Sequence, residues 1–392
     1  MSNFLDLKQN IKMKNFSLNL LSITVALFMM LNVYLATTDQ LYLYKTAFYN
    51  RVGIEDYKIF DNRDIPNGTP EPWLRSKFYN QLALDTTTSK MLTDYESVGY
   101  AVIYKDSLIY EKYFNGYSDS SHTNSFSMAK SMVSLLIGKA LEEGKIKSID
   151  EPVANYLEAF KTEEKKTITI KNVLQMSSGL SWDENYGDDI LSGLVSQTAK
   201  GYYYGDLHKV INDLTVIEVP GTLHRYKSGD TEVLGMILEQ ATGEKLATYF
   251  SKKIWSQIGA EQSSWWSIDE KGHEKAYCCV NSSVTDFARI GKLMLHKGNW
   301  NGKQIIDSNW IMQSAQPCLI KDKEGKQCDY YGLQWWLEKQ EGHNVIFARG
   351  HLGQFIFVIP DLELVIVRLG KKNDKMCIPQ YIKGGINLIK KI

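Results

Sequence analysis

Phe126-Ser-Met-Ala-Lys-Ser131 contains the only serine of this 392-residue chain that is followed by a lysine three positions later. Residues three apart on a helix share one face, so a helix here would bring the Ser127 hydroxyl and the Lys130 amine within reach of each other. A partly desolvated lysine can take the proton of a serine hydroxyl and make it a nucleophile. The competing interpretation is a serine that caps an ordinary helix whose lysine is solvated.

The residues that follow Ser127 favour a buried helix. Gly144 is a typical helix stop, and the apolar side chains before it recur at helical spacing. These apolar positions are Met128, Met132, Leu135, Leu136 and Leu141. A lysine one turn inside a buried helix is less easily explained as a surface residue, which shifts the balance toward a catalytic Ser-Lys pair and leaves both interpretations open.

Composition sets the broad class. With 44% hydrophobic and 12% aromatic residues, the chain can bury the core of one large domain or of two smaller ones. The 45 basic residues balance 45 acidic ones, so the chain has no electrostatic footprint for nucleic acid. We therefore expect a globular protein without a nucleic-acid partner.

The N-terminus carries an uncharged apolar segment of membrane-spanning length. No residue from 15 to 38 is charged, and Lys8, Lys12 and Lys14 precede the segment. About 20 apolar residues span a bilayer, and the positive side stays in the cytoplasm. The sequence predicts a cytoplasmic N-terminus over residues 1–16, a transmembrane signal anchor over residues 17–38, and a catalytic portion on the periplasmic or extracytoplasmic side.

A cleaved signal peptide is the competing interpretation of this segment. The apolar run is long for a signal peptide, and Tyr34-Leu-Ala-Thr-Thr38 is a poor small-x-small cleavage site. We therefore expect the chain to contact the membrane through an uncleaved N-terminal helix.

The remaining chain predicts a sheet built from both ends of one domain. Residues 39–90 are punctuated by prolines and indicate a linker or lead-in with short elements. Residues 91–392 form the predicted domain, with a mostly helical insertion at about 150–270. Aromatic and β-branched runs predict a hairpin and later strands, and helical patterns flank them. The predicted strands are 98–104, 107–114, 332–336, 345–348, 355–359 and 364–368; the predicted helices are 170–176, 231–240, 246–258, 286–296 and a closing helix from 378.

All five cysteines lie late in the chain, at Cys278, Cys279, Cys318, Cys328 and Cys377. None has a histidine spacing typical of a zinc site. A disulfide between Cys318 and Cys328 and a set of free buried thiols are both compatible with the sequence.

Two further motifs follow the first in chain order, Tyr226-Lys-Ser228 and His351-Leu-Gly353. Several segments between them form a framework: Leu174-Gln-Met-Ser-Ser-Gly-Leu180, Pro220-Gly-Thr222, Leu234-Gly235, Thr242-Gly243 and Asp286-Phe-Ala-Arg-Ile-Gly291. In order and spacing, residues 90–390 resemble the serine β-lactamase-related family. That family includes class C β-lactamases, D-Ala-D-Ala carboxypeptidases, certain esterases and 6-aminohexanoate-oligomer hydrolases.

The resemblance implies a fold and a mechanism. The fold is α/β (α+β), β-lactamase/transpeptidase-like: a central antiparallel sheet flanked by helices, with an inserted helical subdomain. Ser127 would attack a carbonyl and form an acyl-enzyme, and Lys130 would hold or receive its proton. Tyr226 would pass the proton to the leaving group, and a cationic neighbour favours its phenolate. The backbone N–H groups of Ser127 and Gln354 would form the oxyanion hole.

Departures from the family pattern bear on the substrate. Leu352 stands where β-lactamases and carboxypeptidases usually have a threonine that helps to hold the substrate carboxylate. Ser228 stands where they usually have asparagine, and it has no amide donor. Both changes weaken the case for penicillin hydrolysis or peptidoglycan trimming. The form Gly350-His-Leu-Gly-Gln354 instead resembles 6-aminohexanoate-dimer hydrolase and related esterases.

Residues beside the motifs are candidates for substrate binding. Ser228, His351 and Gly353 belong to the motifs, and Asp183 and Tyr186 lie in a polar segment that lines the pocket of related hydrolases. His351 either contributes a donor or charge to the substrate or packs beside Arg349 as a strand residue. Gly350 and Gly353 either allow close approach of the strand to substrate or form a bulge or turn.

The sequence thus predicts a serine hydrolase of amide or ester bonds, acting on a small molecule or short peptide. It implies no metal or organic cofactor, and it identifies no protein partner. The alternatives are β-lactamase or D-Ala-D-Ala carboxypeptidase activity, and a non-catalytic penicillin-binding-like module that binds without turnover. Retention of Ser127, Lys130 and Tyr226 favours an enzyme over a binding module.

Overall fold

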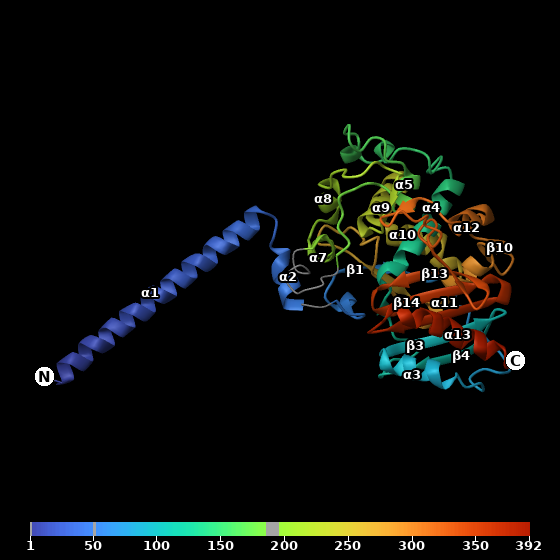
Figure 1. Ribbon diagram of the computed structural model, residues 1–392, viewed down its shortest axis with the longest axis horizontal. Helices are drawn as coiled ribbons and strands as arrows, with labels where there is room; N and C mark the ends of the chain where they lie inside the picture. Colours follow the sequence, from blue (N-terminus) through green and yellow to red (C-terminus); the bar gives the residue numbers. More distant parts are fainter. Residues whose placement is uncertain (1, 50–51, 186–195) are drawn as a thin grey trace.

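The computed structural model describes residues 2–49, 52–185 and 196–392. Its centre is a seven-stranded sheet in the order β12-β13-β14-β15-β3-β4-β2 (Figure 1). The strands are β2 (Leu74–Arg75), β3 (Ser97–Tyr104), β4 (Ser107–Tyr113), β12 (Trp336–Gln340), β13 (His343–Gly350), β14 (Gln354–Ile359) and β15 (Leu364–Gly370). Because β15 pairs antiparallel with β3, the sheet joins both ends of the domain, as the sequence predicts.

Alternation along the strands gives the sheet two buried faces. On β3 and β14, Ala101 and Ile356 belong to one core, and Tyr100 and Phe355 belong to the other. The first core includes α4 (Ala129–Glu142) and α11 (Val284–Leu295), and the second includes α13 (Ile378–Ile389), which also contacts α3 (Thr86–Asp94). Successive side chains of a strand point to opposite faces, so helices cover both sides of the sheet.

The first hairpin turns at Lys105 and Asp106, which have φ values of 47° and 59°. Two consecutive residues with positive φ are typical of the tight turns that match the twist of paired strands. The structure thus confirms the hairpin of residues 98–104 and 107–114.

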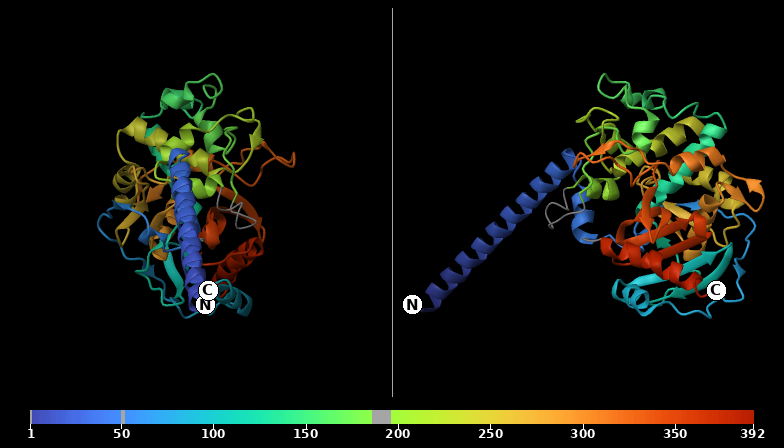
Figure 2. Two further views of the ribbon diagram at one scale, coloured as in Figure 1. Left: turned by 90° about the vertical axis from the view of Figure 1, so that its left-hand side faces the viewer. Right: turned by 45° about the vertical axis from the view of Figure 1, so that its right-hand side comes forward.

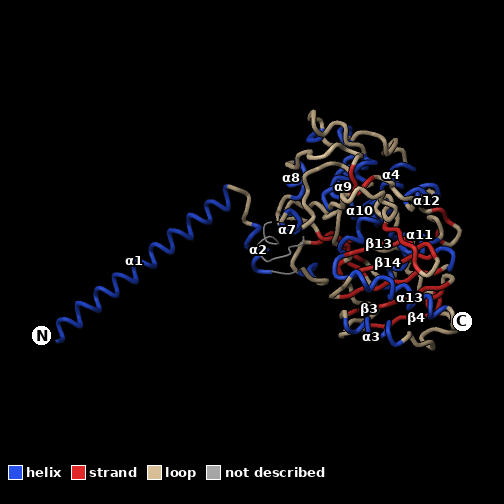
Figure 3. Tube along the Cα trace, viewed as in Figure 1, coloured by secondary structure: helices blue, strands red, loops and turns tan. Residues whose placement is uncertain are grey.

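A helical layer lies over one end of the sheet and carries most of the chain between residues 150 and 270 (Figures 1 and 3). Its central helix α9 packs on α4 and α5. The elements of the layer are α5 (Ile170–Leu174), α7 (Gln197–Tyr203), α8 (Leu207–Asn212), α9 (Ser228–Thr242), α10 (Leu246–Lys253) and the short strand β6 (Leu223–His224). Irregular chain connects these helices, so the region is less regular than the predicted insertion.

A second sheet, β1-β7-β8-β5, ties the lead-in to the domain. It contains β1 (Asn62–Ile65), β5 (Thr123–Asn124), β7 (Ser264–Ser267) and β8 (Val280–Ser282). The lead-in also contributes α2 (Tyr42–Tyr49), whose Tyr42 joins the main core. Because β5 ends two residues before Phe126, this sheet positions the segment that enters the Ser127 motif. The remaining elements are β9 (Asn299–Trp300), β10 (Lys303–Gln304), α12 (Ser308–Ser314) and β11 (Lys321–Asp322).

The predicted strand at residues 332–336 is wrong, because β12 begins only at Trp336. Gln334 has a φ of 68°, which an extended strand does not allow. Its side chain is buried and donates to the carbonyls of Val173 and Leu174 at 3.3 and 2.9 Å. The segment is therefore not a strand, and its Gln334 side chain is hydrogen-bonded to helix α5.

The N-terminal segment is one helix, α1 (Ser2–Thr37), which projects away from the folded domain (Figure 2). Residues Ile11–Thr37 have a mean hydropathy of 2.0, and by length and composition they could cross a membrane. Most apolar side chains of this segment are exposed, although Leu35 is buried. Exposed apolar side chains over such a length are consistent with a helix surrounded by lipid.

Candidate active site

Ser127 and Lys130 lie within hydrogen-bond distance at the start of α4. Ser127 belongs to a 3-10 turn, Phe126–Met128, and α4 begins at Ala129. Lys130 is 1% exposed, and its Nζ donates to Ser127 Oγ at 3.0 Å, Ser228 Oγ at 3.0 Å and the Tyr277 carbonyl at 2.9 Å. An ammonium has three protons, so these three acceptors fully satisfy it.

The surroundings of Lys130 bring its pKa closer to neutral pH. Burial lowers the pKa of the Lys130 ammonium to about 8, although the carboxylates of Glu184 and Glu232 act in the opposite direction. Burial in a low-dielectric site disfavours the charged form of a lysine. Lys130 can therefore hold or release a proton near neutral pH, as a general base must.

Tyr226 lies beside this pair, in a wall of aromatic rings. Its ring is 5.2 Å from Lys130 Nζ and packs 5.3 Å from Trp336 and 6.1 Å from Tyr331. Burial raises the pKa of the Tyr226 phenol, as does Glu184, whereas the hydrogen bond from Ser127 and the charge of Arg349 lower it. The net direction is upward because burial is the largest of these effects, and it favours the neutral phenol over the phenolate that the sequence led us to expect.

Ser228 holds Lys130 in place and is itself held by a carboxylate. Glu184 accepts hydrogen bonds from the Ser228 backbone N–H at 2.6 Å and from Ser228 Oγ at 2.7 Å. Trp182 Nε1 also donates to Glu184 at 2.8 Å. A chain of hydrogen bonds therefore runs from Lys130 through Ser228 to Glu184. Sequence reasoning missed Glu184, because nothing in its local pattern distinguishes it from the other acidic residues.

The other two candidates of this segment are placed differently. Asp183 is exposed, and its backbone N–H donates to the Gln197 side chain at 2.7 Å. Tyr186 lies outside the described residues. The carboxylate that the structure brings to the motif residues is thus that of Glu184, one position after the predicted Asp183.

The third motif forms a turn between β13 and β14. Leu352 and Gly353 have φ values of 58° and 84°, which belong to the left-handed region. A Cβ on Gly350 would lie 2.2 Å from the Ser125 carbonyl oxygen. Gly353 is thus a turn glycine, and Gly350 is required because the end of β13 touches the segment that carries Ser127.

Arg368 of β15 fixes this turn from within the core. Its guanidinium is 0% exposed and donates to the carbonyls of Leu352 and Gly353 at 3.0 and 2.8 Å. The Gln354 side chain donates to the carbonyls of His351 and Gly370 at 3.0 and 2.7 Å. Buried side chains satisfied by backbone acceptors rigidify a loop. Gln354, whose backbone N–H is predicted for the oxyanion hole, is therefore the first residue of β14 and follows a turn that several hydrogen bonds stabilise.

His351 packs against the segment that carries the nucleophile. Its ring lies 5.6 Å from the ring of Phe126 in an edge-to-face arrangement. Burial lowers the pKa of the His351 imidazole, and Arg349 lowers it further. These forces favour the neutral ring, so we assign His351 a packing role with a neutral donor rather than a positive charge.

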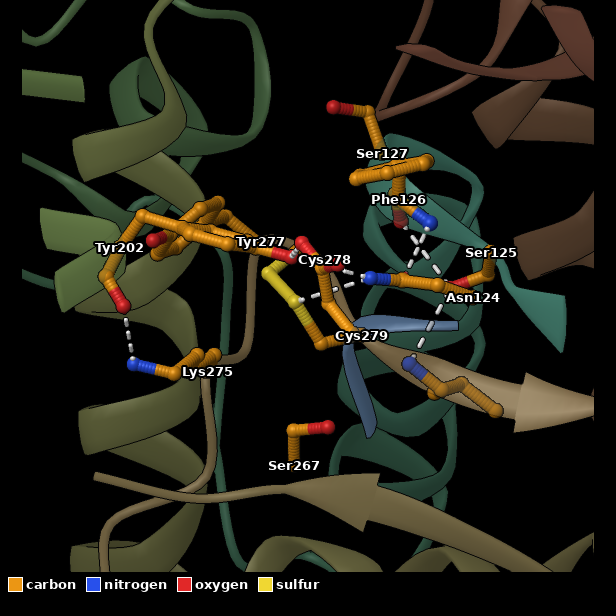
Figure 4. The surroundings of a disulfide bond; sticks show 12 residues. Asn124, Ser125, Phe126, Ser127, Tyr202, Ser267, Lys275, Tyr277, Cys278 and Cys279 are labelled. Atoms are coloured by element: carbon orange, nitrogen blue, oxygen red, sulfur yellow. Dashed lines mark hydrogen bonds between the residues drawn. A yellow bond between two sulfur atoms is a disulfide. The ribbon is translucent and has the colours of Figure 1, made fainter. Parts of the chain in front are cut away.

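A disulfide lies beside the Ser127 motif (Figure 4). It joins the adjacent residues Cys278 and Cys279, whereas Cys318, Cys328 and Cys377 are free thiols. The Cys318–Cys328 disulfide, one of the two predicted alternatives, is therefore not formed in this structure. The sequence did not indicate the adjacent pair, because adjacent cysteines bond only when the local backbone permits it.

Three clusters within the described part of the chain bring together side chains that could hold a metal ion. They are His224, Cys318 and Cys328; His208, Glu239 and His273; and Asp206, Asp269 and His273. None of these clusters contains a residue of the three motifs.

Known proteins resemble this chain in sequence and in fold. A family model described as Beta-lactamase matches residues 84–376. The 6-aminohexanoate-dimer hydrolase of Paenarthrobacter ureafaciens is 24% identical over 287 residues, which cover 70% of this chain and 72% of that protein. A solved Bacillus anthracis structure, provisionally described as a 6-aminohexanoate-dimer hydrolase, matches with a TM-score of 0.74 at 24% identity, over 85% of this chain and 92% of that one. A family VIII carboxylesterase matches with a TM-score of 0.62 at 15% identity, over 80% and 98%. The predicted fold class is confirmed.

Proposed function

This chain belongs to the beta-lactamase family, and we propose that it is a serine hydrolase that cleaves amide or ester bonds through an acyl-enzyme on Ser127. The observation that carries the proposal is the Ser127–Lys130 contact of 3.0 Å, made by a buried lysine whose pKa is lowered to about 8. A general base must lie within hydrogen-bond reach of the proton that it takes, and Lys130 meets this condition at Ser127.

The reaction begins with proton transfer from Ser127 Oγ to neutral Lys130 while Oγ bonds to the substrate carbonyl carbon. The backbone N–H groups of Ser127 and Gln354 receive the oxyanion, a contribution typically worth a hundredfold or more in rate. Tyr226 gives its phenolic proton to the departing amine or alcohol, and the Lys130 ammonium restores that proton. Water then repeats the sequence in reverse on the acyl-enzyme and releases the acid.

Ser228 and Glu184 serve to position Lys130. The carboxylate of Glu184 orients the Ser228 hydroxyl, which accepts one of the three Lys130 hydrogen bonds. Glu184 also raises the Lys130 pKa against the effect of burial. Glu184 is thus a positioning residue that sets both the geometry and the protonation of the base.

The substrate is a linear amide or ester rather than a β-lactam. Leu352 adopts a left-handed φ of 58° and packs against the main core, so the position offers no hydroxyl to a substrate carboxylate. Relatives named 6-aminohexanoate-dimer hydrolase and carboxylesterase support linear amides and esters as the substrate class. We further propose that α1 anchors the enzyme in a membrane with its catalytic domain outside the cytoplasm.

A fluorophosphonate probe tests the nucleophile. Wild-type protein should be labelled at Ser127, and the Ser127→Ala and Lys130→Ala variants should not. Equal labelling of Ser127→Ala would contradict the assignment, and an unlabelled wild type would favour a non-catalytic binding module. A panel of p-nitrophenyl esters, linear amides, D-Ala-D-Ala peptides and nitrocefin then ranks substrates, and preference for nitrocefin would contradict the role given to Leu352.

A further inference from the structure

The Cys278–Cys279 disulfide is buried beneath the proposed active site, with the two residues 3% and 0% exposed. Cys279 has a φ of 73°, a left-handed conformation that is strained for a residue with a side chain. The surrounding backbone is tightly bonded: Trp266 Nε1 donates to the Cys278 carbonyl at 2.8 Å, and the Ser267 N–H donates to the Cys279 carbonyl at 2.9 Å. The disulfide therefore sits in a fixed environment rather than in a free loop.

On one side, the disulfide adjoins the residue that holds Lys130. The Tyr277 carbonyl, directly before Cys278, accepts a hydrogen bond from Lys130 Nζ at 2.9 Å. The Tyr277 ring also lies 5.3 Å from Nζ. Because a carbonyl belongs to the peptide unit shared with the next residue, the conformation at Cys278 determines where this acceptor points.

On the other side, the disulfide adjoins the turn that holds Ser127. Asn124 Nδ2 contacts Cys279 Sγ at 3.8 Å, while Asn124 Oδ1 accepts the Phe126 N–H at 2.8 Å. Phe126 has a φ of 44°, so this hydrogen bond stabilises a strained residue directly before the nucleophile. Ser125 and Val280 form two further hydrogen bonds. The Ser125 N–H donates to the Val280 carbonyl at 2.8 Å, and the Val280 N–H donates to Ser125 Oγ at 3.1 Å. Figure 4 shows Asn124 between the disulfide and the Ser127 turn.

We propose that the Cys278–Cys279 disulfide is a positioning element that holds the Ser127 turn and the acceptor of Lys130 in register. The proposal rests on the proposed hydrolase function. Two equivalents of a thiol reductant would cleave the S–S bond, converting both cysteines to thiols as the reductant becomes a disulfide. The unlinked cysteines lose the constraint on the Tyr277 carbonyl and on Asn124. A disulfide oxidant would reverse the reaction.

The test compares oxidised and reduced forms of the full-length protein in detergent. A Cys318→Ser, Cys328→Ser and Cys377→Ser background removes the other thiols, so a gain of two hydrogens by intact mass measures reduction of this pair alone. Hydrolysis of a p-nitrophenyl ester should lose at least about tenfold in kcat on reduction, as displaced reactive groups do, with KM nearly unchanged. Activity should return when oxidised dithiothreitol restores the bond.

A pH profile distinguishes positioning from a general loss of structure. Loss of the Tyr277 acceptor removes stabilisation of the Lys130 ammonium, so the midpoint of kcat/KM should move to lower pH on reduction. The charged and titratable groups around Lys130, namely Glu184, Glu232, Tyr226 and Tyr277, are present in both forms. The Cys278→Ala/Cys279→Ala variant should match the reduced enzyme and lose all response to redox treatment.

The outcomes separate the two proposals. Equal kcat and an equal pH midpoint in the two redox forms would overturn the positioning role while leaving the hydrolase intact. If reductant fails to open the bond, the double-alanine variant decides: wild-type kcat in that variant would overturn the role. If the oxidised wild type neither hydrolysed any substrate of the panel nor reacted with the fluorophosphonate, the proposed hydrolase function would be contradicted. The positioning role, which rests on that function, would then be contradicted as well.

Discussion

At the scale of single residues, the site combines a base whose pKa is lowered with an acid whose pKa is raised. Burial produces both effects, because it disfavours an ammonium and a phenolate alike. The motifs in the sequence identified Ser127, Lys130, Tyr226 and Ser228, which the structure brings together. They could not give the protonation states, since these depend on tertiary burial. For the same reason, Glu184 could be recognised only once the fold had placed it against Ser228.

Activity should rise with pH through the pKa of Lys130. The pKa is lowered from 10.5 to about 8, so the lysine is protonated and cannot accept the Ser127 proton at low pH. We expect kcat/KM for an ester to increase about tenfold per pH unit below pH 7 and to level off above about 8.5. A profile that is flat from pH 6 to 9, or one with a midpoint near 10, would exclude Lys130 as the base.

Replacement of Glu184 by glutamine should shift that profile. The Glu184 carboxylate raises the Lys130 pKa, so its removal should lower the midpoint of kcat/KM. Loss of the charged acceptor for Ser228 should also reduce kcat by at least about tenfold, because a hydrogen bond to a charged group contributes about 1.5–3 kcal/mol. Glu163→Gln, at an exposed ion pair with Lys166, is the matched control and should change neither quantity. An unchanged midpoint in Glu184→Gln would refute the positioning role.

At the scale of elements, the end of β13 and the Ser127 turn depend on each other. A Cβ at Gly350 would overlap the Ser125 carbonyl at 2.2 Å, and that carbonyl is backbone that cannot rotate away. Gly350→Ala should therefore separate β13 from the nucleophile and reduce kcat/KM at least about a hundredfold, the cost of a 1 Å displacement in an active site.

Gly342→Ala is the control for this change. Gly342 has a φ of 86° with open space around it, so alanine there should lower the melting temperature by strain and leave the kinetics unchanged. Wild-type kcat/KM in Gly350→Ala would show that the close approach has no role in catalysis.

The turn at Leu352 explains why threonine should not convert this enzyme into a β-lactamase. A β-branched residue is a strong outlier at the left-handed φ of 58°, and the change also removes an apolar contact with the core. Leu352→Thr should lower the melting temperature and leave nitrocefin hydrolysis at the wild-type level. A gain of nitrocefin turnover would show that the hydroxyl alone determines substrate choice.

The elements themselves were largely predictable, and the exceptions have physical causes. The hairpin, β13 to β15, and helices α9, α11 and α13 follow clear periods in the sequence. The strand predicted at 332–336 failed because a buried Gln334 hydrogen-bonds two carbonyls between helices. The role of Arg368 in fixing the turn could not be predicted from the sequence either. Its acceptors are backbone carbonyls of Leu352 and Gly353, which come near it only in the folded protein.

At the scale of the whole molecule, α1 is separable from the catalytic domain. A variant that begins at residue 39 keeps Tyr42, which is 8% exposed and packs 6.2 Å from Tyr204. It should leave the membrane fraction and retain kcat within about twofold, because apolar contacts with the core survive. A variant that begins at residue 52 also loses Tyr42 and should melt at lower temperature. If the variant that begins at residue 39 stayed in the membrane fraction, the folded domain rather than α1 would be responsible for membrane attachment.

The pairing of β15 with β3 also determines when the main sheet can form during synthesis of the chain. Strands that neighbour each other at the centre of the main sheet are separated by about 260 residues of chain, and such non-local pairing forms slowly. A ribosome must pass residue 370 before β3 can pair with β15, and the Arg368 that steadies the His351–Gly353 turn belongs to that same strand. The newly made chain should thus be inert until β15 has been synthesised, and a product that stops short of residue 364 should not refold to an active form.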